Sequence, residues 1–476
     1  MPLQDVPIDP LPYDRFAEVL SAEGFRNFEA AVERGREAFK ERVVWNVNST
    51  ARGGGVAEML RSLIARGRGA GIDARWVVIP GDPDFFGVTK RIHNHLHGSQ
   101  GDGGSLGTTE KEIYEKTLEP SARELSDRVS AGDIVLLHDP QTAGLSCELL
   151  ARGAVVIWRC HVGVDVPNDL ARDAWRFLIP YIEDVDGYVF SRRAFEWEGL
   201  DKNKMSVIPP SIDAFAPKNQ DLSREAVEAI LHTAHVTQVD SNGDPTYELV
   251  DGSTARVERK VTYRDGGEPP PADCRIVLQV SRWDRLKDPL GVVKGFADEV
   301  SDDAVHLVVA GPAVEAVADD PEGAQVLEDV YEAWGLLNER VRDRVHLAMI
   351  PMDDGDENAA IVNAMQRRAD VVVQKSIAEG FGLTVAEAMW KGRAVVASKI
   401  GGIQDQIEDG KTGLLVDDPE DLHEYAADVN ALLEDPARAA EIGKAARDRV
   451  RDNFLGPRHL IQYEELMSKL IQAKAK

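Results

Sequence analysis

Two glutamates, Glu379 and Glu387, are separated by seven residues around a glycine-containing turn and are the strongest candidates for ligand chemistry. The apolar run 371–373 precedes this turn and a helical pattern follows it, so a strand, a turn and a helix are expected in series. The first N–H groups of such a helix and its dipole favour a phosphate, and carboxylates accept hydrogen bonds from hydroxyl groups. A sugar nucleotide combines these groups, although acids in a first helical turn are more often simple dipole partners.

The segment 374–390 (QKSIAEGFGLTVAEAMW) resembles the E-x7-E segment of retaining glycosyltransferases with the GT-B fold, the family of sucrose, starch and trehalose synthases. The glycines, the phenylalanine and the helical pattern stand in the same places. The resemblance implies that Glu379 contacts the donor sugar and that Glu387 holds the ribose of a nucleoside diphosphate sugar. It also implies that the turn holds the sugar and the phosphates, through Gly380, Phe381, Gly382, Leu383 and Thr384.

Two basic residues, Arg282 and Lys287, directly follow the apolar run 275–280 in the sequence SRWDRLKD. In a strongly acidic chain they could be solvated charges bridged to nearby aspartates, which stabilises a protein little. They could also clamp a leaving diphosphate, whose negative charge grows as its bond breaks. The second interpretation is favoured, because the R-x4-K spacing matches that of the same glycosyltransferase family.

A second glycine-containing turn lies near the start of the chain, where the apolar run 42–47 leads to Gly53, Gly54 and Gly55 and then to a helical pattern. This order of strand, turn and helix is another candidate anion site. The turn lacks the G-x-G-x-x-G spacing of dinucleotide sites and the lysine of P-loops, so neither chemistry is favoured. From the residues alone, a tight turn without a ligand is an equal alternative. The family resemblance implies a glycine-rich loop that faces the donor phosphates.

These candidates depend on a series of short apolar runs that read as buried strands separated by helical patterns. The runs of the first half are 42–47, 74–79, 133–137, 154–158, 187–190 and 206–208, and those of the second half are 275–280, 305–310, 345–350, 370–373, 394–398 and 413–416. Strands that alternate with helices predict doubly wound α/β domains. The resemblance implies the GT-B fold, in which two Rossmann-like domains face each other across a cleft.

Paired prolines in the sequence IPPSIDAF stiffen the chain after residue 207 and resemble the interdomain hinge of the family. The predicted N-terminal, acceptor-binding domain therefore covers residues 1–213, and the predicted C-terminal, nucleotide-sugar-binding domain covers residues 214–450. A last helix, 451–476, is expected to pack back on the first domain, as in other GT-B proteins. The stretch 237–270 has the turn residues of a hairpin and is expected to be an insertion without a chemical role.

His161 stands at the end of the sequence WRCH, where a predicted strand ends and α/β proteins usually bind ligands. From the pattern alone, two interpretations of this histidine have equal weight: a structural group with its hydrogen bonds satisfied within the protein, or a contact to a ligand. Retaining GT-B enzymes carry a strand-end histidine beside the donor sugar, so the resemblance implies this role for His161. An aspartate often follows closely in that family, whereas here Asp165 is four residues on. The segment 138–142 (HDPQT) also follows a predicted strand.

The segment 81–98 is rich in aromatic, imidazole, amide and basic side chains and is expected to be a loop, which on composition alone could be merely solvated. Together with WRCH it resembles the trehalose glycosyltransferring synthases, which join a nucleoside diphosphate glucose to glucose. The resemblance implies that Lys90, His93 and Asn94 bind the acceptor. A phosphorylated acceptor would need a cationic fork. Glucose 6-phosphate is therefore disfavoured as the acceptor, but it stays an alternative because Lys90 and Arg91 are available.

The composition excludes several other classes of protein. The 476 residues carry a formal net charge of −27, which argues against nucleic acid or an anionic membrane as a partner. The first residues lack the basic and apolar regions of a signal peptide, and no apolar run is long enough to span a bilayer. Three scattered cysteines indicate neither a disulfide framework nor a zinc site. We expect a cytoplasmic enzyme without a metal or other cofactor, and leave a homodimer open.

The sequence as a whole predicts retaining glucosyl transfer from a nucleoside diphosphate glucose to free glucose, giving α,α-trehalose, with UDP, ADP and GDP as alternative carriers. Front-face attack, in which the departing phosphate takes the proton of the acceptor, suits a site made of charge-stabilising groups. Transfer to another sugar or to a sugar phosphate, as in sucrose or trehalose phosphate synthesis, is the near alternative. A sugar-nucleotide epimerase, a pyridoxal-phosphate-dependent phosphorylase and an inactive nucleotide-binding module are the alternatives from other classes.

Overall fold

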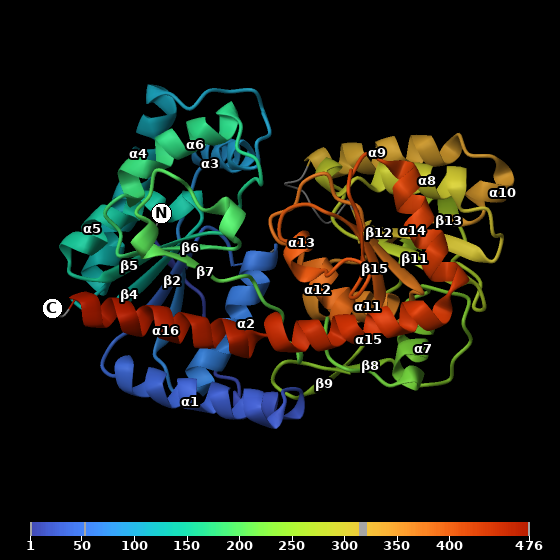
Figure 1. Ribbon diagram of the computed structural model, residues 1–476, viewed down its shortest axis with the longest axis horizontal. Helices are drawn as coiled ribbons and strands as arrows, with labels where there is room; N and C mark the ends of the chain where they lie inside the picture. The colour runs from blue at the N-terminus through green and yellow to red at the C-terminus, as the bar shows by residue number, and fades with distance from the viewer. Residues whose placement is uncertain (1, 52–53, 314–320, 475–476) are drawn as a thin grey trace. The chain divides into compact units, whose positions relative to one another are not determined.

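The computed structural model of the chain describes residues 2–51, 54–313 and 321–474. The chain forms two compact units: unit 1 contains Met1–Ser211 and Phe454–Lys476, and unit 2 contains Ile212–Asn453. Each unit has a largely parallel β-sheet with helices on both of its faces (Figure 1). The predicted α/β class is therefore confirmed.

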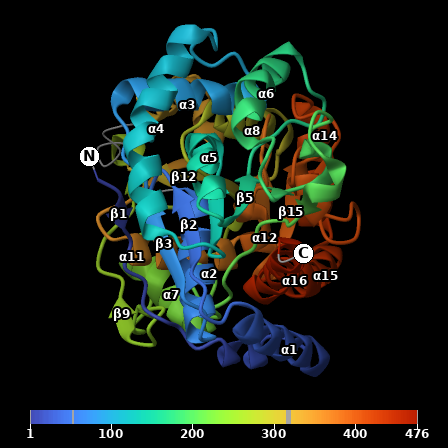
Figure 2. The ribbon, with the colours of Figure 1, turned by 90° about the vertical axis from the view of Figure 1, so that its left-hand side faces the viewer.

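The sheet of unit 1 has seven strands, and all neighbours except one pair run parallel. In sheet order they are β1 (Gln4–Asp5), β3 (Ala74–Val78), β2 (Val44–Asn48), β4 (Ile134–His138), β5 (Val155–Cys160), β6 (Gly187–Phe190) and β7 (Met205–Val207). The short strand β1 pairs antiparallel with β3 and forms one edge of the sheet (Figure 2). Strands covered on both faces read as continuous apolar runs, which is why the sequence predicted six of the seven.

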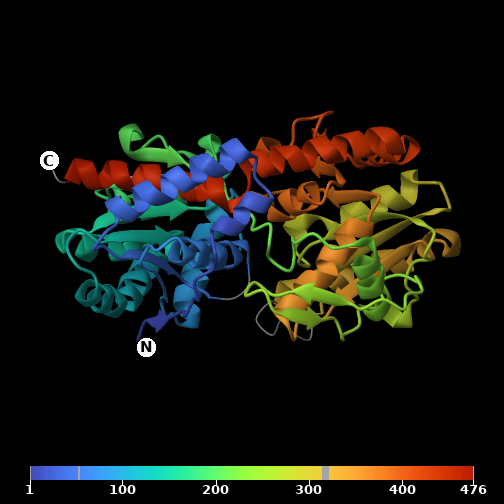
Figure 3. The same ribbon diagram turned by 90° about the horizontal axis from the view of Figure 1, so that it is seen from below.

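Helices cover the two faces of this sheet as two separate hydrophobic clusters. One cluster contains residues of α3 (Pro83–Leu96), α4 (Thr108–Arg128), α5 (Ser146–Ala151) and α6 (Asp169–Ile182). The other face is covered by α1 (Ala22–Ala38), α2 (Gly55–Gly69) and α16 (Gly456–Lys474), and α1 and α16 lie side by side (Figure 3). The last helix thus belongs to unit 1, although unit 2 lies before it in the sequence.

Unit 2 repeats the arrangement with a different strand order. In sheet order its strands are β10 (Thr262–Tyr263), β13 (Val345–Ile350), β12 (Val305–Pro312), β11 (Arg275–Val280), β14 (Val371–Gln374), β15 (Ala394–Ser398) and β16 (Leu414–Val416). Only β10 is antiparallel to its neighbour. Among the six parallel strands the order is that of a Rossmann sheet, with the chain reversing its direction of winding between β11 and β14.

The helices of unit 2 also divide between the two faces of the sheet. The first face packs on α8 (Pro289–Glu299), α9 (Pro321–Gly335) and α14 (Leu422–Glu434). The second face contacts α11 (Gly355–Arg368), α12 (Leu383–Trp390) and α15 (Pro436–Asn453), with α7 (Arg224–Thr233) packed on α11. The short helices α10 (Glu339–Arg342) and α13 (Ile403–Gln406) lie in connections.

The stretch 237–270 contains the expected hairpin, formed by β8 (Thr246–Glu248) and β9 (Thr254–Arg256) in antiparallel pairing. Its last part was not anticipated, because β10 joins the main sheet of unit 2 beside β13. A two-residue strand is too short to give a periodic pattern, so the sequence carried little signal for it.

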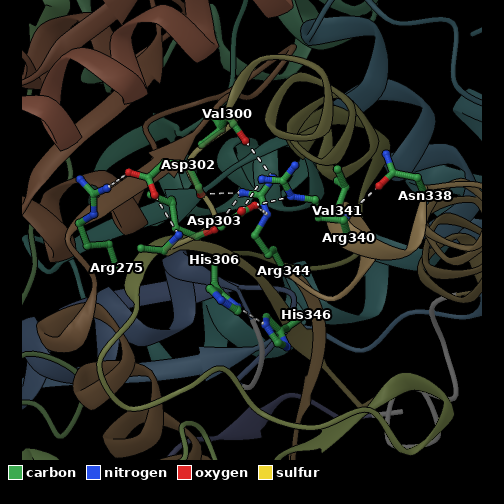
Figure 4. A network of polar contacts seen from close by, with 12 residues as sticks. Arg275, Val300, Asp302, Asp303, His306, Asn338, Arg340, Val341, Arg344 and His346 are labelled. Atoms are coloured by element: carbon green, nitrogen blue, oxygen red, sulfur yellow. Dashed lines mark hydrogen bonds and ion pairs between the residues drawn. The ribbon is translucent and has the colours of Figure 1, made fainter.

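A network of polar contacts lies at the amino ends of β11, β12 and β13 (Figure 4). Its centre is Arg344, which is buried and donates hydrogen bonds to the main-chain oxygens of Val300, Asp302 and Val305 at 2.9–3.1 Å. Nearby, Arg340 pairs with Asp303, but its side chain is 74% exposed. The buried guanidinium therefore holds the loop before β12 against β13, whereas the exposed pair contributes little.

We expect that Arg344→Met lowers the free energy of unfolding by about 2–4 kcal/mol, because three main-chain oxygens lose a charged donor. Arg340→Ala, the matched exposed control, should change it by less than about 1 kcal/mol. Urea unfolding followed by tryptophan fluorescence measures both. Equal losses in the two variants would contradict the structural role given to Arg344.

Candidate functional site

Two loops of unit 2 meet where the direction of winding reverses, which is the usual place for a ligand in an open α/β sheet. They follow the adjacent strands β11 and β14 and contain Lys287 and Glu379. The main-chain N–H of Ile377 donates to the oxygen of Leu286 at 2.8 Å and joins the loops. Gln279 donates its side-chain amide to the oxygen of Lys287, also at 2.8 Å. Two segments that the sequence singled out separately therefore form one site.

The ammonium group of Lys287 donates a hydrogen bond to the carboxylate of Glu379, and the side chains are 18% and 12% exposed. Arg282 behaves differently, because its side chain is 63% exposed and lies 3.4 Å from Asp284. An ammonium has three donors, so Lys287 can hold Glu379 and a phosphate oxygen at once. The structure thus brings Lys287 and Glu379 together and leaves Arg282 on the surface.

The turn that contains Gly380, Phe381 and Gly382 leads into α12, as predicted from the sequence, and Leu383 and Thr384 are the first two residues of the helix. Gly382 has a φ of 84° and caps the helix without a side chain, which leaves the first N–H groups of α12 accessible to an anion. The turn rests on the Gly401–Gly402 segment: a Cβ atom at Gly401 would lie 1.7 Å from the oxygen of Glu379. Gln406 also donates to the oxygen of Phe381 at 2.5 Å. These contacts hold the turn in one conformation.

Glu387 is buried in the second half of α12 and has two lysines around it. The Nζ atom of Lys218 lies 3.8 Å from its carboxylate. Lys391, the residue directly after α12, is buried and donates to Asn219 Oδ1 and to the main-chain oxygen of Glu387, both at 3.2 Å. Burial lowers the pKa of Lys391 well below its ordinary value, while the Glu387 charge opposes this shift. Neither lysine was predicted from the sequence, although Lys391 stands at the helical i+4 spacing.

In unit 1, the glycine turn follows β2 and leads into α2. Gly54 has a φ of 79° and precedes the helix, and Gly55 is the first helical residue. Gly53 lies outside the described residues. Strand β2 is the neighbour of β4 in the sheet, and the direction of winding reverses between these two strands. Unit 1 therefore has a reversal point of its own, where β2 ends.

His161 follows β5 and is buried in a polar layer on one face of the unit 1 sheet. Its ring Nε2 lies 3.2 Å from Nδ1 of His138, whose Nε2 lies 3.2 Å from Asn46 Oδ1. The Nε atom of Arg159 lies 3.1 Å from the His161 ring, and its guanidinium also donates to the hydroxyl of Tyr463 at 3.0 Å. Burial, and then the Arg159 charge, lower the pKa of His161, so this imidazole is neutral and firmly oriented.

Asp139 is a further candidate that the sequence indicated only through its position after β4. Its backbone has a φ of 63°, and its carboxylate accepts the main-chain N–H of His161 at 2.8 Å. Burial raises the pKa of Asp139 to about 7, although the N–H of His161 and the Arg159 charge act against this. Strain and a raised pKa in one residue are typical of functional sites. Asp165, by contrast, forms an ion pair with Arg192 at 2.5 Å.

The segment 81–98 was predicted to be a loop, and this prediction is wrong. It contains α3 (Pro83–Leu96). Asp82 caps the helix by accepting the N–H of Phe85 at 2.8 Å, and proline is the first helical residue, so the sequence does carry the start signals of this helix. The helical spacing places Lys90, His93 and Asn94 on one face of α3. Lys90 is exposed, and His93 and Asn94 are half-buried. The three predicted acceptor residues therefore do lie together.

The sequence offered Arg91 as a cation for a phosphorylated acceptor, but in the structure its guanidinium is not available for this role. Its guanidinium donates two hydrogen bonds to Asp102 at 2.9 Å and one to the main-chain oxygen of Ser105 at 2.6 Å. It also pairs with Glu110 at 3.2 Å. The planar fork that would recognise a phosphate is therefore already used within the protein.

The part of the chain that the structure describes contains no group of three or more histidine, cysteine, aspartate or glutamate side chains arranged to bind a metal. Within the same residues, each helix is too short or too polar to cross a bilayer.

Comparison with known proteins gives independent matches to both halves of the chain. Residues 46–196 match the family model "Trehalose synthase, N-terminal domain", and residues 266–449 match "Glycosyl transferases group 1". The chain is 36% identical to the trehalose synthase of Pyrococcus horikoshii, over 92% of each chain. It is 37% identical to the trehalose synthase of Rubrobacter xylanophilus, over 90% of each chain.

Among solved structures, the α,α-trehalose-phosphate synthase (UDP-forming) of Burkholderia vietnamiensis superimposes with a TM-score of 0.66. The match has 16% sequence identity and covers 89% of this chain and 98% of the other. At this identity the likeness concerns the fold, and it confirms the predicted GT-B class.

We expect that the stability of unit 2 rises as the pH increases from neutrality toward the ordinary lysine value of 10.5. Burial lowers the pKa of Lys391, so in this range the folded state binds fewer protons than the unfolded state, and stability rises with pH. Lys391→Met should remove this part of the slope, whereas the exposed Lys444→Met should keep it. Urea unfolding at several pH values measures the slopes, and identical slopes in all three proteins would contradict the assignment.

Proposed function

We propose that this chain, which belongs to the trehalose synthase family of the group 1 glycosyltransferases, transfers glucose from a nucleoside diphosphate glucose to free glucose with retention, giving α,α-trehalose. Family membership makes it a glycosyltransferase of trehalose metabolism; the donor, the acceptor and the stereochemistry are the proposal. The observation that carries it is the contact between Lys287 and Glu379 beside the start of α12.

The donor half of the proposal assigns each group by its chemistry. Glu387 accepts hydrogen bonds from the ribose hydroxyls, and Arg282 and Lys287 hold the diphosphate. Glu379 and the turn amides from Gly380 hold the glucosyl group, and His161 gives it a further contact. A UDP-forming enzyme among the structural neighbours supports uracil as one base to test, with adenine and guanine beside it.

The proposed reaction needs charge stabilisation more than a nucleophile. The bond between the anomeric carbon and the phosphate oxygen breaks, and the acceptor oxygen forms its bond on the same face. The departing phosphate takes the proton of the acceptor hydroxyl. Lys287 is well placed to stabilise the growing phosphate charge, because its partly buried ammonium is already oriented by Glu379.

The acceptor half of the proposal rests on α3. Lys90, His93 and Asn94 share one helix face and offer donors and acceptors that match sugar hydroxyls. Arg91 is bound by Asp102 on two of its nitrogens, so a guanidinium fork for a phosphate is missing from this helix as far as the structure describes it. This pairing favours free glucose over glucose 6-phosphate.

The deciding experiment is product analysis by NMR after incubation with UDP-, ADP- or GDP-glucose and glucose, fructose or glucose 6-phosphate. We expect α,α-trehalose from glucose. Trehalose phosphate from glucose 6-phosphate, without trehalose from glucose, would overturn the acceptor assignment. Sucrose from fructose alone would indicate the sucrose-type reaction. An incubation without acceptor tests the epimerase alternative, because an epimerase converts the donor by itself.

Lys287→Ala should lower kcat by about 10²–10³-fold, because one oriented group that stabilises developing charge is lost. Arg282→Ala should also lower kcat, but by a smaller factor, since its side chain is largely exposed. Lys294→Ala, at an exposed position of α8, is the matched control and should keep wild-type kinetics. Kinetics are compared with melting temperatures, and wild-type kcat in a folded Lys287 variant would remove the phosphate role.

Glu387→Gln and Glu379→Gln should affect different kinetic constants. Contacts with the ribose change little during the reaction, so Glu387→Gln should raise KM for the donor more than it lowers kcat. The glucosyl group changes its charge and shape, so Glu379→Gln should mainly lower kcat. Steady-state kinetics with varied donor separate the two effects. If both variants changed only KM, the proposed division of roles would be wrong.

A further inference from the structure

Lys375, the residue that directly follows β14, is buried with no exposed side-chain surface. Its ammonium donates hydrogen bonds to the carboxylate of Asp288 and to the main-chain oxygen of Pro419. A buried ammonium is costly unless it is paired and hydrogen-bonded, so these acceptors are a condition for its presence.

The partners of Lys375 come from the loops after three different strands. Asp288 follows the short helix Arg285–Lys287 in the loop after β11, and Pro419 lies in the loop after β16. Lys375 itself begins the loop after β14. One ammonium therefore joins three loops at the carboxyl edge of the sheet.

Two of these loops carry the proposed donor-binding groups. Asp288 is the next residue after Lys287, and Lys375 lies four residues before Glu379. The hydrogen bond from Ile377 N–H to the oxygen of Leu286 joins the same two loops. Three contacts therefore join these two loops: Lys375 to Asp288, Ile377 to Leu286 and Lys287 to Glu379.

Asp288 also shows that the loop is held in a conformation that needs support. It has a φ of 48°, which is unfavourable for a residue with a side chain. Its other carboxylate oxygen caps α8 by accepting the N–H of Gly291 at 2.9 Å. The carboxylate thus joins the cap of α8 to the ammonium of Lys375.

We propose that Lys375 is a positioning residue, which holds Lys287 and Glu379 at the spacing needed to bind a diphosphate and stabilise its departure. It does so through Asp288, and it does not itself touch the substrate. The kinetic part of this inference rests on the proposed function. The arrangement of the loops does not, because it can be measured without any substrate.

The competing interpretation is that the ion pair only stabilises unit 2. Three variants separate the two. Lys375→Met removes the ammonium and leaves Asp288 unpaired. Asp288→Asn removes the charge but keeps the cap of α8, because asparagine caps helices as well as aspartate does. The double variant contains neither charge and therefore no unpaired buried ion.

The chain offers a matched control in the exposed pair of Lys399 and Asp417, whose charged groups are 2.7 Å apart at the ends of β15 and β16. Lys399→Met removes a lysine from a Lys–Asp pair of the same unit without disturbing a buried contact. It should keep wild-type kinetics and stability.

We expect Lys375→Met to lower kcat by about 10–100-fold, the size of effect produced by a small misplacement of catalytic groups. The double variant should regain most of the lost thermal stability but not kcat. Recovery of kcat together with stability would overturn the proposal, as would a folded Lys375→Met with wild-type kcat.

Hydrogen exchange of the Ile377 amide in the protein without substrate tests the inference independently of the reaction. Exchange should accelerate at least tenfold in Lys375→Met and in the double variant, and stay unchanged in Lys399→Met. Unchanged exchange in Lys375→Met would overturn the proposal. If the wild-type protein made no trehalose while exchange changed as expected, the proposed function would fail and the positioning role would stand.

Discussion

The adjacency of β11 and β14 in the middle of the unit 2 sheet determines which side chains can meet at its carboxyl edge. Parallel strands all end at the same edge, and the reversal of winding leaves the loops after these two strands facing each other. Lys287 and Glu379 are 92 positions apart in the sequence and share a hydrogen bond for this reason. The phosphate-binding start of α12 follows in the same loop, so the sheet order brings cation, carboxylate and helix start to one place.

Buried cations are common to both units, in a chain with 82 acidic and 55 basic residues. Lys375 in unit 2 and Arg159 in unit 1 are fully buried beside the carboxyl edge of their sheets. Each has acceptors from distant parts of its unit, which for Arg159 include Tyr463 of the last helix and the oxygen of Ile208. The energetic cost of removing such a charge from water makes these acceptors obligatory and so keeps the surrounding loops in place.

The sequence was most informative where a local pattern reflects a local structure. Continuous apolar runs located the parallel strands, and the glycines around Glu379 located the start of α12. The capping residue Asp82 was a local signal too, but the polar composition of 81–98 outweighed it. Pairings between distant residues left no such pattern. Nothing near Arg91 in the sequence indicates that Asp102 binds its guanidinium. In the same way, nothing near Lys391 in the sequence indicates that burial lowers its pKa.

Through the short strand β10, the stretch 237–270 has a structural role that is separate from catalysis. Thr262 and Tyr263 pair with Met349 and Ala348 and so cover the open edge of β13. An uncovered edge strand presents a row of unpaired N–H and C=O groups, on which another molecule can build a strand. A shortened chain without this stretch would expose that edge of the sheet. Its loss would be seen first as aggregation of the protein.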